Sequence, residues 1–446
     1  MNENIRLFFE KSKEIGYIDS KLYKEYSVKN GLRNEDGTGV LVGLTKISDV
    51  VGYYKENDEK IDQHGELYYR GINVKDIIEH SKTKNANLYE EVCFLILFGY
   101  LPNKEEFEIF TKELHKKYAL PKHFLESKIL RFPTKNLMNK LQQDVLTLYG
   151  YDKTPDDVSI DHILEQGLHI VGKIPSLICY NYQSKIHYYE RKSMFIHNTD
   201  KNLSVAENIL QMIRPDQKFT ATEARVLDIA LVLHADHGGG NNSTFVNVVM
   251  SSSGTDIYSS FAGAIGSLKG PKHGGANLKV CDMMDTVINE IGYDADETVI
   301  KDIVCRLLDK DYYDKSGLIY GMGHAVYTLS DPRSEILCDA AEKLAAEKGM
   351  QREYDFYKRF EKVAKEMIYE YKGIRCSSNV DFYSGFVYEM LNIPRDLYTL
   401  LFVCARSVGW LAHNIESQLY SGKIVRPATK YVGEAEAYID IEMRGK

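Results

Sequence analysis

The chain has 446 residues, enough for a large buried core and for about two or three domains by length alone. Hydrophobic residues make up 44% of it and charged residues 27%, as in an ordinary globular protein. The formal net charge of −8 argues against a protein that binds nucleic acid.

The cysteines and the N-terminus indicate the cellular compartment. The seven cysteines are dispersed, with no CxxC pair, and several lie within apolar runs. Such a set is typical of reduced core thiols, so we expect a reducing compartment. Residues 1–14 mix acids with bases and lack the apolar core of a signal peptide, and no apolar stretch is long enough to span a bilayer. These patterns predict a cytoplasmic protein without membrane contact.

The pattern of secondary structure is mainly helical. Proline is scarce, with 10 in 446 residues, which leaves room for long helices. Residues 46–70 are the best candidate for a small sheet. Asn103 with Glu106 forms a capping-box pattern that predicts a helix start, and Thr220 with Glu223 repeats it before an almost wholly apolar run. That run predicts a buried helix.

Capping residues and glycines also mark the later helices. Thr255 or Asp256 is expected to begin a helix that is poor in large residues, as close helix packing requires. Further helices are expected over residues 334–348, 353–372, 382–391 and 395–418. The predicted fold class is therefore all-α (mainly helical) with a minor β element.

The first polar interruption of the apolar pattern is Leu233-His234-Ala235-Asp236-His237, at the expected end of the buried helix. His234 and His237 are three residues apart, so a continuing helix places them on one face. They are either satisfied histidines at a helix C-terminus, where histidine is favoured, or contacts to a ligand or substrate.

Two further histidines follow glycines. His273 lies in Gly270-Pro271-Lys272-His273-Gly274-Gly275, which predicts a tight loop between two helices, and His324 follows Gly321-Met322-Gly323. Glycines allow a ligand to approach the backbone closely. A turn histidine without function is the alternative for His273.

One aspartate and three arginines complete the polar set. Arg333 follows Pro332, which suits a first helical turn, so it is either a solvated residue or part of an anion site at a helix N-terminus. Asp381 either caps the following helix or has its pKa raised by apolar neighbours towards general-base function. Arg406 lies in an apolar run and must reach solvent or meet an anion. Arg426 is uninformative alone.

Taken together, these residues suit proton transfer on an anionic substrate that bears carboxylates. No serine elbow, P-loop or Gly-x-Gly-x-x-Gly after a strand is present. Over roughly residues 45–433, the order and spacing of the motifs resemble the citrate synthase family. The matching segments are Leu-His-Ala-Asp-His (233–237), Gly-Pro-Lys-His-Gly-Gly-Ala-Asn (270–277), Gly-His-Ala-Val-Tyr (323–327), Asp-Pro-Arg (331–333), Asn-Val-Asp-Phe-Tyr-Ser-Gly (379–385), Ala-Arg-Ser-Val-Gly-Trp-Leu-Ala-His (405–413) and Arg-Pro (426–427).

The resemblance implies a role for each group. His273 would hydrogen-bond the thioester carbonyl of acetyl-CoA while Asp381 removes a methyl proton, and His324 would protonate the ketone of oxaloacetate. The groups that would hold oxaloacetate are His237, Arg333, Arg406 and Arg426, the last from the partner subunit of a homodimer. The loop that would touch CoA contains Gly321, Met322, Gly323, Ala325 and Val326. No metal and no cofactor are expected, since acetyl-CoA is a substrate.

The resemblance also implies a large helical domain with a smaller helical domain inserted in it. The expected boundaries are residues 1–275 for the first part of the large domain, 276–392 for the small domain and 393–446 for the C-terminal part of the large domain. The chain departs from the family at Ser378, where proline is common, and at Gly238-Gly239-Gly240. Both departures predict looser segments beside catalytic residues.

Three rival functions are considered. 2-Methylcitrate synthase would use propionyl-CoA on the same residues, and the sequence does not separate it from citrate synthase. A metallo-β-lactamase-like hydrolase is suggested by His234-Ala235-Asp236-His237, but its motif needs a further histidine where Val232 stands. A binding protein without catalysis fits poorly because every catalytic position is filled.

Overall fold

The computed structural model describes residues 3–57, 59–81 and 87–444. The chain divides into two compact units, Met1–Leu44 with Val425–Lys446 and Thr45–Ile424. The smaller unit contains α1 (Glu3–Ile15), α2 (Lys21–Glu25), η1 (Asn30–Leu32) and η4 (Ile441–Met443). The candidate site residues all belong to the larger unit, except Arg426, which is expected to bind oxaloacetate.

Helices dominate the larger unit, as the sequence predicted. Its first helices are α3 (Val74–His80), α4 (Leu88–Phe98), α5 (Lys104–His115), η2 (Leu125–Leu130), α6 (Leu137–Tyr149), α7 (Ile160–Glu190), α8 (Val205–Ile213) and α9 (Ala221–His234). Then follow α10 (Asn242–Ser251), α11 (Ile257–Leu268), α12 (Ala276–Ile291), α13 (Glu297–Leu308), α14 (Pro332–Lys348), α15 (Gln351–Lys372), α16 (Val380–Met390), η3 (Arg395–Leu397) and α17 (Tyr398–Tyr420). None of the described helices combines the length and apolar character needed to cross a bilayer.

The small sheet lies close to where it was predicted. β1 (Ser48–Glu56) pairs antiparallel with β2 (Glu59–Tyr69), and β2 pairs with the short β3 (Ile72–Asn73). The register joins Ser48 to Tyr69 and shifts between Val51 and Tyr53. Inward side chains such as Leu67 and Tyr69 are buried, which ties the sheet to the helical core.

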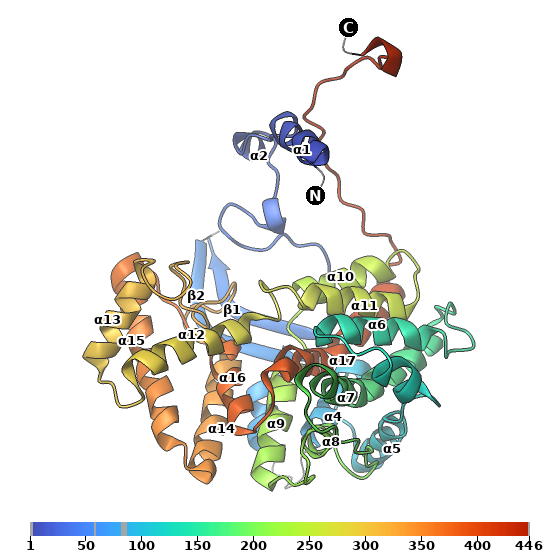
Figure 1. Cartoon of the computed structure of the whole chain (residues 1–446), viewed down its shortest axis with the longest axis vertical. Helices are drawn as coiled ribbons and strands as arrows, with labels where there is room; N and C mark the ends of the chain where they lie inside the picture. Colours follow the sequence, from blue (N-terminus) through green and yellow to red (C-terminus); the bar gives the residue numbers. More distant parts are fainter. Residues whose placement is uncertain (1–2, 58, 82–86, 445–446) are drawn as a thin grey trace. The chain divides into compact units, whose positions relative to one another are not determined.

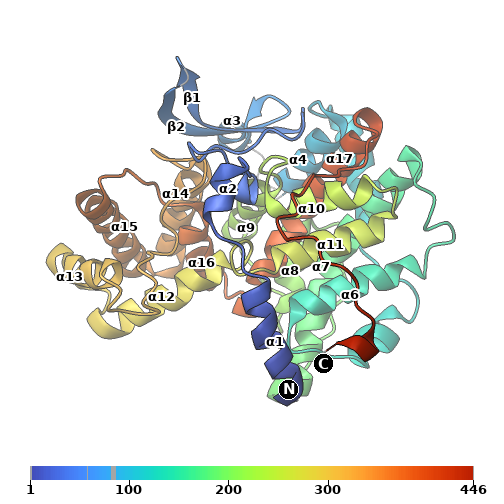
Figure 2. The ribbon, with the colours of Figure 1, turned by 90° about the horizontal axis from the view of Figure 1, so that it is seen from above.

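Helix α9 runs through the middle of the larger unit. Its capping box is formed as predicted, with Thr220 accepting from the N–H of Glu223 and Glu223 accepting from the N–H of Thr220. Almost every residue of α9 is buried, because the helix packs against α14 on one side and against α4, α8 and α17 on the other. Figures 1 and 2 show α12–α16 on one side of α9 and α4, α7, α11 and α17 on the other.

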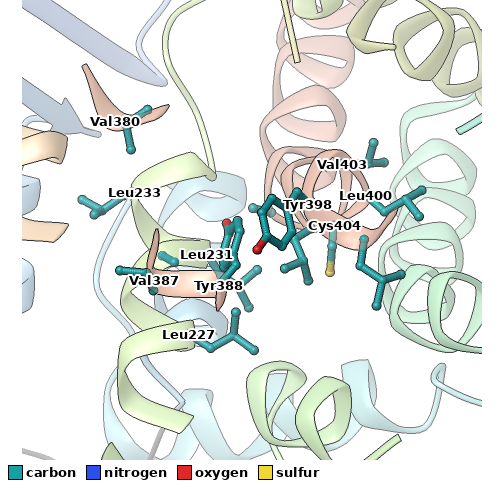
Figure 3. Close-up of a cluster of buried hydrophobic side chains, with 14 of the residues drawn as sticks. Leu227, Leu231, Leu233, Val380, Val387, Tyr388, Tyr398, Leu400, Val403 and Cys404 are labelled. Atoms are coloured by element: carbon teal, nitrogen blue, oxygen red, sulfur yellow. The ribbon is translucent and has the colours of Figure 1, made fainter. Parts of the chain in front are cut away.

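The elements that carry the candidate site share one apolar core. Figure 3 shows side chains of α9, α16 and α17 packed around a common cluster. The labelled members are Leu227, Leu231, Leu233, Val380, Val387, Tyr388, Tyr398, Leu400, Val403 and Cys404. Interiors of this kind are close-packed, so the ends of these three helices are held at fixed positions. The predicted domain boundaries at 275/276 and 392/393 stay predictions.

Candidate active site

The chain leaves α9 just before the second of the paired histidines. α9 ends at His234, so His237 lies beyond the helix and the prediction of a shared helix face is wrong. The physical reason is Asp236, a fully buried carboxylate that turns the chain towards β1 and α17. It accepts hydrogen bonds from the hydroxyl of Ser48 and from Nε2 of His413 at 3.1 Å.

His234 is a satisfied core histidine. Its Nδ1 donates to the carbonyl oxygen of Ala230 at 2.8 Å, within its own helix. Burial lowers the pKa of His234 to about 3, so the ring is neutral at physiological pH. For His234, the interpretation as a satisfied histidine at a helix C-terminus is therefore confirmed.

His237 is not satisfied in this way. Its Nε2 is buried and has no hydrogen-bond partner among the residues that the structure describes. Burial, helped by the nearby Arg333 charge, holds the pKa of His237 well below its ordinary value. A buried polar atom without a partner is costly, typically about 1–3 kcal/mol, and a bound ligand can remove that cost. The ring lies 5.1 Å from that of His324, centroid to centroid.

His324 is fixed in one orientation by its own loop. Its Nδ1 accepts the backbone N–H groups of Val326 at 3.0 Å and Tyr327 at 3.2 Å. A backbone N–H can only donate, so the neutral ring carries its proton on Nε2. The loop rests on β2 at Gly65, where a Cβ atom would lie 2.2 Å from the carbonyl oxygen of Ser330. Only glycine permits this contact, so the sheet supports the His324 loop directly.

Asp381 lies in the first turn of α16. The N-cap of that helix is Asn379, whose side chain accepts the N–H of Asp381 at 3.0 Å, so the capping interpretation of Asp381 is wrong. Burial raises the pKa of the Asp381 carboxyl to about 6, with the Arg333 charge opposing the shift. A carboxyl group that titrates near neutrality is suited to general-base catalysis.

Arg333 is a buried residue, not a solvated one. Pro332 begins α14 as predicted, and Asp331 caps the helix. The same aspartate accepts Nε of Arg333 at 3.0 Å and Nη2 at 2.7 Å. Arg333 is 5% exposed, so this bidentate pair orients its guanidinium within the protein interior.

Arg406 is buried at the C-terminal end of α9. It is 1% exposed, and its Nε donates to the carbonyl oxygen of His234 at 2.7 Å. Across the described ranges, no carboxylate lies within 4.0 Å of its guanidinium. Burial lowers the pKa of Arg406 to about 10, so the group stays charged at neutral pH. A buried cation of this kind marks a place where an anion is favoured.

His273 lies in the loop between α11 and α12, as predicted. Its Nε2 accepts the backbone N–H of Ser243 at 3.3 Å and lies 3.0 Å from the Ser243 hydroxyl. The proton of neutral His273 is therefore on Nδ1. Burial, aided by the Arg406 charge, lowers the pKa of His273 to about 4. The Ser243 hydroxyl is itself held by Nε1 of Trp410 at 3.3 Å and by Oδ1 of Asn241 at 3.1 Å.

Among the residues around His273 and Arg333, sequence reasoning missed Ser243 and left Asp331 without a role. Ser243 is 30 positions from His273, and nothing in its own surroundings signals the contact. Asp331 stood within a recognised motif, and its position directly before Pro332 is a signal for an N-cap that also reaches Arg333.

The loop that contains Gly321, Met322, Gly323, Ala325 and Val326 lies beside the start of α16. Gly321 has φ of +84°, and a Cβ atom there would lie 3.0 Å from Cβ of Phe382. Met322 forms a β-bridge with Ser378. The loop is thus seated on the residues that precede Asp381, while Ala325 is exposed.

Arg426 lies in the smaller unit, where it is exposed. Its expected contact with oxaloacetate stays a prediction.

The remaining candidates act on one another electrostatically. Arg333 influences the pKa values of both His237 and Asp381, and Arg406 influences those of His237 and His273. Within the described residues, no three His, Cys, Asp or Glu side chains are arranged to hold a metal ion. The motif around His237 follows a helix, whereas the hydrolase motif follows a strand. Neutral His273, the oriented ring of His324, a carboxyl group with a pKa of about 6 and buried cations define an acid–base enzyme for an anionic substrate.

Comparison with known proteins identifies the family. A family model described as citrate synthase, C-terminal domain, matches residues 34–428. The chain therefore belongs to the citrate synthase family, which is of the acyltransferase class.

Individual relatives agree with this assignment. A citrate synthase from Haloferax volcanii is 34% identical over 402 residues, covering 89% of this chain and 95% of its own. A 2-methylcitrate synthase from Shewanella oneidensis is 30% identical over 371 residues, covering 82% and 88%. A structure of Thermoplasma acidophilum citrate synthase in a ternary complex with carboxymethyl coenzyme A and oxaloacetate has a TM-score of 0.75 and 26% identity, covering 94% of this chain and 99% of its own. The predicted fold class is thereby confirmed.

Proposed function

We propose that this family member is a citrate synthase, which condenses acetyl-CoA with oxaloacetate and hydrolyses the resulting citryl-CoA to citrate and CoA. The observation that carries the proposal is the fixed protonation of two histidines. His273 has its proton on Nδ1 and His324 has its proton on Nε2, because a backbone N–H occupies the other nitrogen of each ring. Condensation needs two such donors, one for each carbonyl oxygen, and a base for the methyl group.

In the first step Asp381 accepts a proton from the methyl group of acetyl-CoA. The electron pair of the broken C–H bond moves towards the thioester oxygen, where Nδ1–H of His273 donates a hydrogen bond. Asp381 suits this step because its pKa of about 6 leaves it ionised at neutral pH yet more basic than an exposed carboxylate.

In the second step the nucleophilic carbon attacks the ketone carbon of oxaloacetate. The C=O π electrons move to oxygen, which takes the proton from Nε2 of His324. Water then cleaves the thioester of citryl-CoA, releasing citrate and CoA. Neutral His324 is suited to act as this acid because its partners on Nδ1 fix the direction of its N–H.

Oxaloacetate is proposed to bind between His237, Arg333, Arg406 and the partner subunit's Arg426. The charge of Arg406 has no carboxylate partner among the described residues, and Nε2 of His237 has no hydrogen-bond partner there either. A dicarboxylate with a ketone oxygen supplies what both groups lack. The related Thermoplasma acidophilum enzyme is described in complex with oxaloacetate.

CoA is proposed to lie along the loop from Gly321 to Val326 and to extend into a cavity of about 320 Å³ that the segment after this loop helps to line. Lys365, Arg375 and His64 line that cavity, and Thr328 of the same chain segment as His324 contributes to it. The guanidinium of Arg375 and the ammonium of Lys365, which also pairs with Glu361, suit the phosphate groups of CoA. The chain is further proposed to work as a cytoplasmic homodimer in which Arg426 completes the partner's site.

The main alternative is 2-methylcitrate synthase, favoured by the likeness to the Shewanella oneidensis enzyme. Steady-state release of CoA from acetyl-CoA and propionyl-CoA, each with oxaloacetate, separates the two. We expect kcat/KM to be higher with acetyl-CoA by about 10-fold or more, since one methylene is worth roughly 1–3 kcal/mol in a fitted pocket. The opposite preference assigns 2-methylcitrate synthase, and no CoA release from either rejects both.

A further inference from the structure

Residues 377–379 connect the loop of His324 to the helix of Asp381. The N–H of Gly323 donates to the carbonyl oxygen of Ser377 at 2.7 Å, and the N–H of Asn379 donates to that of Gly321 at 2.8 Å. The side-chain amide of Asn379 donates to the carbonyl oxygen of Gly323 at 2.9 Å and also caps the helix of Asp381. A shift of this segment therefore moves the base and the acid relative to each other.

Segment 377–379 is also hydrogen-bonded to Glu361, a buried carboxylate of α15. Oε1 of Glu361 accepts the hydroxyl of Ser378 at 2.6 Å, and Oε2 accepts the hydroxyl of Tyr383. Ser378 precedes Asp381 by three residues and Tyr383 follows it by two. Glu361 therefore accepts hydrogen bonds from the chain both before and after the candidate base. Burial alone would raise the pKa of Glu361, but Lys365 and the hydroxyl donors lower it, so the carboxylate is charged.

A second hydroxyl fixes Ser378 in turn. The hydroxyl oxygens of Ser378 and Ser334 lie 2.9 Å apart, and both residues are buried. Since Ser378 donates to Glu361, Ser334 is the donor to Ser378. Ser334 lies in the first turn of α14 beside Arg333, so the chain of hydrogen bonds joins α15, the segment 377–379 and the helix that bears a candidate oxaloacetate ligand.

We propose that Glu361, Ser378 and Tyr383, here named the Glu361 clamp, position Asp381 against His324 during catalysis. The clamp restrains the backbone at Ser378 by hydrogen bonds, as a proline ring would restrain it covalently. The inference rests on the proposed condensation reaction, because only that reaction uses the two groups in sequence. Glu361 and Ser378 are positioning residues that touch no substrate.

The backbone at Ser378 allows a direct test. Ser378 and Met322 face each other across the bridge, whose two hydrogen bonds come from Gly323 and Asn379. The N–H of Ser378 takes no part in the bridge, so proline removes no bridge hydrogen bond there. Ser378→Ala therefore removes the clamp contact, whereas Ser378→Pro removes it but supplies a stiff backbone instead.

The test compares kcat, both KM values and amide hydrogen exchange at Gly323 and Asn379 in the full chain. Ser378→Ala is expected to lower kcat by about 10-fold, because small misplacements of reacting groups are costly, with KM values changed by less than about twofold. Exchange at the two amides should quicken. Ser378→Pro should keep kcat within about threefold and keep the amides protected. Ser176→Ala, which removes another buried serine hydrogen bond of 2.7 Å, should lower the melting temperature similarly and leave kcat unchanged.

Coupling between the clamp residues is measured with Glu361→Gln. The double variant Ser378→Ala/Glu361→Gln should be no slower than Glu361→Gln alone, since both changes break the same contact. If Glu361→Gln does not fold, Tyr383→Phe replaces it as a single variant: it breaks the hydrogen bond to Oε2 of Glu361, so it should by itself lower kcat and quicken exchange at Asn379. Unchanged kcat and exchange in Ser378→Ala, a slow Ser378→Pro, or effects that multiply would each overturn the clamp. Failure of the unsubstituted chain to release CoA rejects the proposed function instead, and amide exchange then still decides the clamp.

Discussion

Replacement of the candidate base with its uncharged analogue, Asp381→Asn, should make the protein inactive and more stable at the same time. Folding raises the pKa of Asp381 from 3.8 to about 6. Between these two values the folded state binds the proton more tightly than the unfolded state, so stability falls as pH rises through that window. At about 1.4 kcal/mol for each pKa unit, the ionised carboxylate destabilises the folded protein by about 3 kcal/mol above pH 6.

Asparagine resembles the protonated carboxyl group and avoids this cost. We therefore expect Asp381→Asn to raise the free energy of unfolding by up to about 3 kcal/mol at pH 8, with the gain shrinking towards zero as pH falls below 4. Urea unfolding at several pH values measures it. In the same variant kcat should fall by at least about 10²-fold, the low end for loss of a general base, while oxaloacetate still binds.

Asp294→Asn is the matched control. Asp294 is exposed and bonded to Arg352, which lowers the pKa of its carboxyl group, so this change should not stabilise the protein at pH 8. Equal stability of Asp381→Asn and the unsubstituted chain at pH 8, or a gain that is the same at pH 4, would refute the burial argument. Near-normal kcat would exclude Asp381 as the base.

Three further predictions concern metal, assembly and CoA binding. Exhaustive chelation should leave turnover intact, because the histidines are assigned as proton donors; loss that zinc restores would favour a metal hydrolase. Co-expressed Asp381→Asn and Arg426→Ala chains, each nearly inactive alone, should regain activity in doubly tagged dimers, since mixing makes about half the dimers mixed and leaves roughly a quarter of all sites intact. No recovery in confirmed mixed dimers rejects a shared site. Arg375→Gln should raise KM for acetyl-CoA about fivefold and leave KM for oxaloacetate unchanged, whereas Arg191→Gln should change neither; equal effects of the two would remove Arg375 from the CoA site.

Local signals in the sequence predicted most of the secondary structure. The capping boxes at Asn103 and Thr220 and the proline at position 332 act within one turn of helix, so they can be read without knowledge of the fold. The last residue of α9 could not be predicted, because it depends on hydrogen bonds from Ser48 and His413, in distant parts of the chain, to Asp236.

In the candidate site, too, local sequence signals were recognised, whereas contacts between distant parts of the chain were not. The residue types at His273, His324 and Asp381 were evident from their motifs, but their protonation was not. The tautomer of His273 depends on the backbone of Ser243, and the stiffness of the Asp381 segment depends on Glu361 in another helix. Ser378 was expected to loosen that segment, whereas its hydroxyl is bonded to a buried carboxylate.

Among the described residues, Arg406 has no carboxylate partner and Nε2 of His237 has no hydrogen-bond partner, which bears on the lifetime of the protein. Burying such groups is costly, so under the proposed function a dicarboxylate that binds them would also stabilise the folded protein. A ligand at 100 times its Kd adds about 2.7 kcal/mol to the free energy of unfolding. Proteases that attack transiently opened chains act on the open population, which shrinks by the same factor. Under the proposed function, supply of the substrate would therefore regulate how long the enzyme survives as well as how fast it works.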